Sequence, residues 1–276
     1  MRTTHPIPIL LLALATGAFH GCRPVDRCCD PGDFVDGDAP LQPDNGAGFV
    51  LSFDDAYVDA WWETADLLEA HGARATFFVS RIDRLDEEQV ERLRQLEARG
   101  HEVGCHGYRH LKAGVVDREG GADAWAAEEI LPALDAFADA GLAPTSFAFP
   151  HGEHTDDTGE AALRYFDRVR GSRFIGPVPE VRDVDAVFLP AAELPGRRFS
   201  CSFAIDERYG ITSDRLTRAL ERASERDEVL ALYGHEPLED ADGGYETSHA
   251  LLRVLLEHAA EDGLRSYLYR EFGDTP

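Results

Sequence analysis

The sequence predicts an α/β fold in which parallel β-strands alternate with crossover helices. From residue 48 onward, short β-type runs alternate with amphipathic stretches at helical spacing, several of which end in glycine. Some of the β-type runs are almost continuously apolar, as expected for strands that are covered on both faces. The pattern is compatible with a closed barrel or an open doubly wound sheet. Both architectures carry their chemistry at the carboxyl ends of the strands.

The expected elements follow one another at short intervals. Strands are predicted from short β-type runs at residues 48–53, 73–80, 101–106, 146–150, 228–235 and 264–270. Helices are predicted from helical apolar spacing at residues 61–72, 86–100, 122–140, 213–226 and 248–261. Acidic residues begin the second helix and glycine ends it, as is typical of helix termini. Pro132 predicts a kink in the third helix.

The N-terminal segment has the layout of an export signal. Arg2 precedes a short apolar run at residues 7–19, and small residues follow it. The run is too short to cross a bilayer, which takes about 20 residues. Gly21 and Cys22 resemble the end of a bacterial lipoprotein signal, so residues 1–22 predict either lipidation of Cys22 or simple cleavage. Both outcomes export the protein to the bacterial periplasm, the outer membrane or the cell surface.

The rest of the chain divides into a linker and one domain. Residues 23–47 are dense in Pro, Gly and Asp and predict a linker that cannot bury a core. Residues 48–276 are expected to form the catalytic domain. If Cys22 carries a lipid, an even number of cysteines remains. These four, which allow three disulfide pairings, are Cys28, Cys29, Cys105 and Cys201.

The charge of the chain limits its partners. There are 27 basic and 52 acidic residues, which gives a formal net charge of −25. Nucleic-acid binding needs clustered Lys and Arg that displace counterions, so this balance argues against it. It also argues against docking on anionic lipid, which leaves a lipid on Cys22 as the expected link to a membrane. We expect the acidic surface to be a solvated one and the protein to be a monomer.

Chemically useful residues gather where the predicted strands end. Each of four strands is followed by an acid, an imidazole or a Pro-X-Gly turn. The residues at these positions are Asp54, Asp55, His106, His110, His235 and the turn at residues 150–152. Any one of them alone has an ordinary structural explanation, but parallel strands bring their carboxyl ends to one face. The sequence therefore predicts a single shared site.

The residue types at this site favour a divalent metal. His106 and His110 are four residues apart, so both imidazoles can reach one ion. One carboxylate and two imidazoles form a familiar metal-binding set with open positions for water and substrate. The second of the two neighbouring aspartates is then free to act as a base.

With these strand ends, the sequence resembles the polysaccharide deacetylase family, also called the NodB-homology or carbohydrate esterase 4 group. Four motifs carry the resemblance in the family's order. They are SFDD at residues 52–55, HGYRH at 106–110, FAFPHG at 147–152 and YGH at 233–235. The resemblance covers about residues 48–270 and implies a distorted (β/α) barrel of about seven strands, of NodB-homology type.

The sequence departs from the family pattern in four places. Ala148 replaces the third-motif arginine, which in the family helps set the catalytic carboxylate, and no fourth motif of the form D-x-x-x-W is found. Gly107 replaces Ser or Thr, and Tyr233 replaces Leu. The form FAFPHG is similar to the third motif of some bacterial exopolysaccharide deacetylases. These departures are consistent with a subfamily.

The resemblance assigns roles to individual residues. Asp55, His106 and His110 are the expected metal ligands, with Zn²⁺ as the expected ion and Co²⁺ or Ni²⁺ as alternatives. Asp54 is the expected general base and His235 the expected general acid. For substrate binding, the resemblance points to Pro150, to the backbone N–H of His151 and to Tyr233 near the acetyl methyl group.

The function expected from these residues is metal-dependent removal of N-acetyl groups from a polysaccharide. The product would be acetate and a free amine on an N-acetylglucosamine-containing glycan, either an exopolysaccharide or peptidoglycan. Two alternatives remain open at this point. One is a metal-dependent amidohydrolase that acts on a small cyclic amide, and the other is a surface lipoprotein that binds glycans without turnover.

Overall fold

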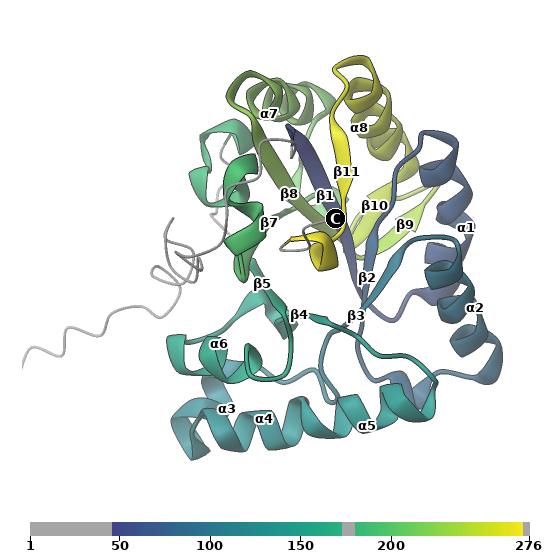
Figure 1. Ribbon diagram of the computed structural model, residues 1–276. Coiled ribbons are helices and arrows are strands. Elements are labelled where there is room, and N and C mark those ends of the chain that lie inside the picture. The colour runs from purple at the N-terminus through teal and green to yellow at the C-terminus, as the bar shows by residue number, and fades with distance from the viewer. Residues whose placement is uncertain (1–45, 173–179, 273–276) are drawn as a thin grey trace, which may run out of the picture.

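The computed structural model describes residues 46–172 and 180–272, and it shows the predicted barrel (Figure 1). Seven parallel strands are hydrogen-bonded in sequence order, and a pairing between the first and the last closes the ring. The strands are β1 (Gly48–Asp55), β2 (Thr76–Val79), β3 (Glu102–Cys105), β4 (Ser146–Ala148), β5 (Arg168–Ser172), β7 (Phe199–Ala204) and β8 (Glu228–Gly234). The predicted signal segment, and the linker up to residue 45, lie outside the described residues.

Four short strands lie outside this ring. β11 (Arg265–Tyr267) runs parallel to the start of β1, on the edge that β2 occupies further along. β6 (Phe188–Pro190) is antiparallel to the start of β8. β9 (Glu236–Leu238) and β10 (Glu246–Ser248) form a separate parallel pair just beyond β8.

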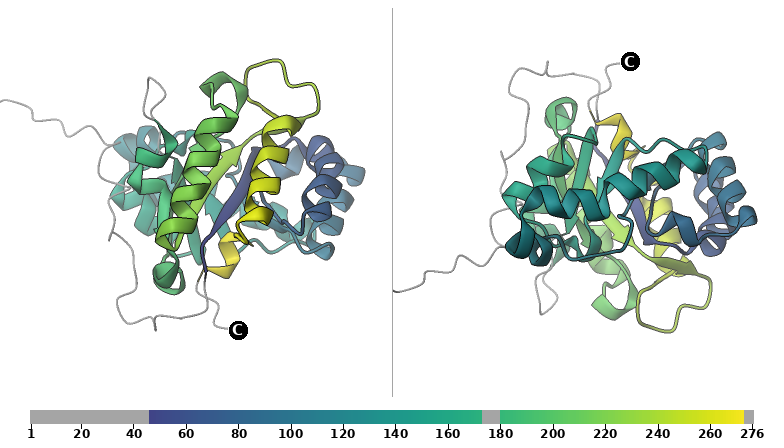
Figure 2. Two further views of the ribbon diagram at one scale, coloured as in Figure 1. Left: turned by 90° about the horizontal axis from the view of Figure 1, so that it is seen from above. Right: turned by 90° about the horizontal axis from the view of Figure 1, so that it is seen from below.

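The helices surround the barrel (Figure 2). They are α1 (Val58–Ala70), α2 (Glu87–Ala98), α3 (Ala113–Gly120), α4 (Ala122–Glu129), α5 (Leu131–Asp139), α6 (Asp156–Ala162), α7 (Ser213–Arg226) and α8 (His249–Glu261). Asp86 begins α2 with a capping box, as the acidic start of this stretch predicts. Helix 122–140 is divided at Ile130 into α4 and α5, two residues before the predicted kink at Pro132. Within the described ranges, no helix has the length and apolar character needed to cross a membrane.

The core has two layers because successive residues of a strand face opposite sides. In β1, Phe49, Leu51 and Phe53 belong to the large cluster that packs against the helices. Val50 belongs to a second cluster, which also contains Phe78. Ser52 and Asp54 of β1 face the same side of the strand as Val50, and they are buried and polar. This side of the strand therefore becomes polar toward the carboxyl end of the barrel.

The sequence-based elements are confirmed where they were predicted. The strands β5, β6, β7, β9 and β10 and the helices α3 and α6 were missed. The missed strands β5 and β7 carry arginine and serine among their apolar residues, and the missed helices α3 and α6 are only 8 and 7 residues long. Polar strand residues remove the alternation on which such predictions rely. Of the four cysteines, Cys105 is a buried free thiol, and Cys201 is disulfide-bonded. A pairing that uses all four is therefore excluded.

Candidate active site

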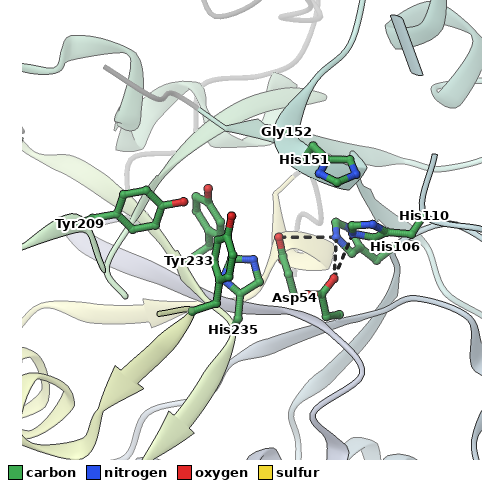
Figure 3. A pocket seen from close by; sticks show the side chains of 10 residues that line it. Asp54, His106, His110, His151, Gly152, Tyr209, Tyr233 and His235 are labelled. Carbon is green, nitrogen blue, oxygen red and sulfur yellow. Dashed lines mark ion pairs between the residues drawn. The ribbon is translucent and has the colours of Figure 1, made fainter. Parts of the chain in front are cut away.

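The predicted site residues meet in one pocket at the carboxyl ends of the strands (Figure 3). The cavity measures about 250 Å³. Its lining contains seven of the residues predicted from the sequence, and these are Asp54, Asp55, His106, His110, His151, Tyr233 and His235. Pro150 begins the turn Pro150–Gly152, which carries His151, and its side chain is buried. Gly152, Tyr209 and Tyr245 complete the wall.

Asp55, His106 and His110 form a compact group of donor atoms. One carboxylate oxygen and two imidazole nitrogens lie within 4.8 Å of one another. Nε2 of His110 is 3.0 Å from Oδ1 of Asp55, and Nε2 of His106 is 3.7 Å from the same oxygen. A mixed set of nitrogen and oxygen donors with an open side suits Zn²⁺ and similar divalent ions. The residues present therefore fit the metal that the motifs imply.

The orientation and charge of these donors are fixed by their surroundings. Nδ1 of His106 is 2.8 Å from the carbonyl oxygen of Ala148, which can only accept, so Nδ1 carries the proton and Nε2 offers its lone pair to the site. Burial lowers the pKa of His106 to about 4, which keeps the ring neutral. Burial alone would raise the pKa of Asp55, but its hydrogen bond with His110 and the nearby imidazoles lower it well below its usual range. A neutral imidazole and an ionised carboxylate are the forms that bind metal.

Unusual backbone conformations are concentrated in the pocket. Asp55, His110 and His151 have φ angles of 82°, 63° and 60°, and they are three of the five non-glycine residues with positive φ in the described chain. Such residues cost about 1 kcal/mol or more each and persist only where other contacts hold them. Contacts within the pocket therefore hold these three residues in conformations that they would otherwise rarely adopt.

Asp54 is held by a buried arginine that the sequence analysis did not identify. Nη2 of Arg170 lies 2.6 Å from both carboxylate oxygens of Asp54, and both side chains are almost fully buried. The guanidinium carbon is 4.7 Å from the ring centre of Tyr233 and 5.2 Å from that of Phe78. An aromatic pair thus covers the cation that neutralises the carboxylate.

Arg170 accounts for two departures from the family pattern. Residue 148 of β4 pairs in register with Arg170 of the neighbouring strand β5. The arginine that Ala148 replaces is therefore present one strand further around the barrel, at the same level. Tyr233, which stands where the family has Leu, packs on this guanidinium. The third-motif position carries Ala148, as the sequence shows, and a guanidinium from β5 reaches the Asp54 carboxylate from the neighbouring strand.

His235 also has a carboxylate partner that the sequence analysis missed. Oδ2 of Asp206 is 2.7 Å from Nδ1 of His235, and Oδ1 accepts a hydrogen bond from the backbone N–H of the same histidine. Trp61 donates its indole N–H to the carbonyl oxygen of His235 at 2.9 Å. Burial alone would lower the pKa of His235, but the hydrogen bond with Asp206 and the charge of Asp54 raise it above 6.5. Asp206 therefore stabilises the protonated form of this ring.

A sequence signal for Asp206 existed. It lies two residues beyond β7, so the same strand-end rule that found Asp54 would have found it had β7 been recognised. Tyr209 follows three residues later and lines the pocket. Residues 206–209 thus supply an acid and an aromatic residue, the two residue types of the fourth motif, although the motif itself is not present. Arg170 had no comparable signal, because nothing in RVRGS indicates which arginine is buried.

Aromatic rings surround His235 at the mouth of the pocket. The ring centre of Tyr245 is 4.9 Å from that of His235, and Tyr245 is 46% exposed. A second hollow of about 380 Å³ continues from the pocket past Ser172 and Arg208. The guanidinium carbon of Arg208 lies 4.1 Å from the ring centre of Tyr245. An exposed aromatic face beside an open hollow can pack against a sugar ring.

Comparison with known proteins agrees with this geometry. The family model described as Polysaccharide deacetylase matches residues 42–165. No curated protein matches the sequence. A family 4 carbohydrate esterase from Streptomyces lividans, solved in complex with acetate, has a similar structure with a TM-score of 0.53 at 17% identity. That match covers 82% of this chain and 95% of the other.

Two further solved structures are similar. The chitin deacetylase from the fungal pathogen Colletotrichum lindemuthianum gives a TM-score of 0.52 at 17% identity, over 86% of this chain and 92% of that one. A CE4 family pseudoenzyme from Bacillus anthracis gives 0.53 at 14% identity, over 83% and 66%. The fold alone follows from similarities at this level of identity. Residues 42–165 match the polysaccharide deacetylase family model, and the chain therefore has the (β/α) barrel fold of the carbohydrate esterase 4 structures, as its motifs predict.

Proposed function

We propose that the protein is an exported, metal-dependent polysaccharide deacetylase that hydrolyses N-acetyl groups of an N-acetylglucosamine-containing glycan. The observation that carries this proposal is the meeting of three partnered groups in one open pocket. They are the donor set of Asp55, His106 and His110, the ionic pair of Asp54 with Arg170, and the hydrogen-bonded pair of His235 with Asp206.

The proposed reaction adds water to an amide and releases acetate and an amine. A divalent ion bound to Asp55, His106 and His110 would polarise the acetyl carbonyl and acidify a water molecule. Asp54 takes the proton of the attacking water, and Arg170 keeps this carboxylate in place. The backbone N–H of His151 donates a hydrogen bond to the oxyanion that develops on the acetyl oxygen. Pro150 has no N–H, so it cannot serve as that donor.

His235 completes the proposed reaction on the opposite side of the scissile bond. An amine leaves poorly unless it is protonated, and His235 donates that proton to the nitrogen. The raised pKa of His235 favours the protonated form at neutral pH. Asp206 accepts a hydrogen bond from the other ring N–H, at Nδ1, and so fixes which ring nitrogen faces the substrate. Tyr233 and the exposed ring of Tyr245 lie on this side and would contact the acetyl group and the sugar.

The glycan and the location are parts of the same proposal. A bacterial N-acetylglucosamine polymer is favoured by the FAFPHG form of the third motif and by the export signal expected at residues 1–22. The similarity to a chitin deacetylase is in line with this substrate class. We propose that the enzyme acts outside the cytoplasm, either anchored through Cys22 or released by simple cleavage.

The glycan-binding alternative loses its main support. It was favoured by the missing third-motif arginine and the missing fourth motif. Arg170 and Asp206 supply partners for the base and the acid, so neither group is left unsupported. The similarity to a pseudoenzyme still makes turnover the quantity to measure.

The decisive experiment measures acetate released by the purified protein from a panel of glycans. The panel contains poly-N-acetylglucosamine, peptidoglycan, chitin oligosaccharides and acetylated xylan, with a cyclic amide as a small-molecule control. We expect acetate from an N-acetylglucosamine polymer, loss of activity with a chelator, and recovery with Zn²⁺ or Co²⁺. Glycan binding without acetate release would support the binding alternative, and ring opening of the cyclic amide would support the amidohydrolase.

A further inference from the structure

A single residue accepts most of the backbone hydrogen bonds of the loop that carries His110. Glu129, the last residue of α4, accepts hydrogen bonds from the backbone N–H groups of four consecutive loop residues, 108–111. Its carbonyl oxygen accepts from Tyr108 at 3.0 Å. Its carboxylate accepts from Arg109 at 3.1 Å, from His110 at 3.2 Å and from Leu111 at 2.7 Å. The Glu129 side chain is fully buried, so the acceptor itself is shielded from water.

Gly107 provides the space that this carboxylate needs. A Cβ atom added at Gly107 would lie 2.3 Å from Oε2 of Glu129 and 3.3 Å from Cγ of Pro150. Gly107 also has a φ of 83°, which side chains rarely adopt. Glycine, where the family has Ser or Thr, therefore leaves the room that the Glu129 carboxylate occupies.

His110 itself adopts a strained backbone, with φ of 63°. Its N–H is one of the three that the Glu129 carboxylate accepts. A residue in this conformation is kept there by its surroundings. Without the carboxylate, the N–H groups of three consecutive residues would lose their acceptor, and the loop would lose the contacts that keep His110 directed at Asp55.

We propose that Glu129 is a positioning residue for the metal site, which presets the His110 loop through its backbone before any ion binds. This inference rests on the metal set of the proposed function but not on the identity of the substrate. Groups that orient metal ligands from behind typically change metal affinity by 10- to 100-fold when they are removed. Glu129 differs from the usual case because it holds the backbone of the ligand and not its imidazole ring.

The test is a zinc titration of the purified chain in competition with a chromophoric chelator, with Glu129→Gln as the main variant. The amide offers one acceptor oxygen and points an N–H₂ group at backbone donors. We expect zinc affinity to fall by about 10- to 100-fold. Gly107→Ala, which pushes the carboxylate away from the loop, should weaken zinc binding in the same direction. The two changes together should cost less than their sum, because they break the same contact.

Two controls separate positioning from ordinary stability. Glu102→Gln alters another buried carboxylate with three hydrogen bonds, from Thr76, Ser146 and the N–H of Arg270, at the amino end of β3. It should lower the melting temperature but leave zinc affinity unchanged. Glu128→Gln alters the exposed neighbour that pairs with the Arg109 side chain, and it should change neither quantity.

Each outcome decides the proposal. Zinc affinity of Glu129→Gln within threefold of the parent, with a melting temperature lowered as in Glu102→Gln, would overturn it. If Glu129→Gln does not fold, Gly107→Ala is judged by the same threefold limit. The titration uses no substrate, so a parent protein that binds zinc and hydrolyses nothing would contradict the proposed function but leave this inference standing.

Discussion

The metal side and the proton-transfer side of the pocket are held in place by different means. On the metal side, main-chain groups do most of the positioning: the carbonyl oxygen of Ala148 orients His106, and the N–H groups around His110 are bound by Glu129. On the proton-transfer side, charged side chains do the positioning. Arg170 reaches across the barrel from β5 to Asp54, and Asp206 follows the strand next to the one that His235 follows. Arg170 lies 116 residues from Asp54, and Asp206 lies 29 residues from His235.

This difference shows where each property of the site is determined. The metal ligands themselves lie in two short motifs, residues 52–55 and 106–110, which the sequence shows directly. The base depends on an ion pair across the barrel, so its position depends on closure of the barrel, whereas the acid depends on a pair between the ends of the neighbouring strands β7 and β8. Variants should therefore separate metal binding from turnover.

The largest difference between the effect on turnover and the effect on metal binding is expected for Asp54→Asn. The variant keeps Asp55, His106 and His110, so zinc binding should stay within a few-fold of the parent. Loss of the general base should lower kcat by about 10²- to 10⁴-fold. Acetate release and a zinc titration on the same preparation check both halves of this expectation. Deacetylation at the parent rate would show that another group removes the proton.

Arg170→Gln tests the ion pair behind the base. Removal of one partner of a buried pair leaves an uncompensated charge, which typically costs about 3–5 kcal/mol of unfolding free energy. Denaturant unfolding measures this loss, and kcat should fall as well because Asp54 is no longer fixed. Arg222→Gln is the matched control, since Arg222 is also buried and paired with Glu228, away from the pocket. If both variants lose stability but keep full kcat, Arg170 has only a structural role.

His235→Ala removes the proposed proton donor on the other side of the substrate. The rate on an N-acetyl amide should fall by about 10²-fold or more, because the amine leaves only when it is protonated. An aryl acetate with an activated leaving group should lose much less, and zinc binding should be unchanged. Rates on the two substrate types, measured with the same enzyme sample, test this. Equal losses on both would argue against a role as general acid.

The same division explains how much the sequence could predict. The α/β class, most helices and the residues Asp54, Asp55, His106, His110 and His235 follow from strand-end positions and motif spacing, which are local patterns, and the choice of a barrel over an open sheet came from the family resemblance of these motifs. The role of Arg170 could not be predicted in this way, because its burial depends on the register between β4 and β5. Asp206 lies beyond β7, whose serines and cysteine hide the strand pattern. Long-range pairing in the closed barrel determines both partners, and one sequence read along its length does not reveal it.

The smallest effect is expected for Asp206→Asn, and it concerns pH. The hydrogen bond with Asp206 raises the pKa of His235, so the asparagine variant should have a lower pKa at this ring. A general acid works in its protonated form, and the rate falls as the pH rises through its pKa. The basic limb of the kcat/KM profile should therefore move to lower pH, with a loss of roughly tenfold at neutral pH, less than the loss of the whole acid. The acidic limb should stay in place, because the substitution changes a partner of His235 and not of the base side of the pocket. A shift of both limbs together would mean that the two sides of the pocket titrate as one unit.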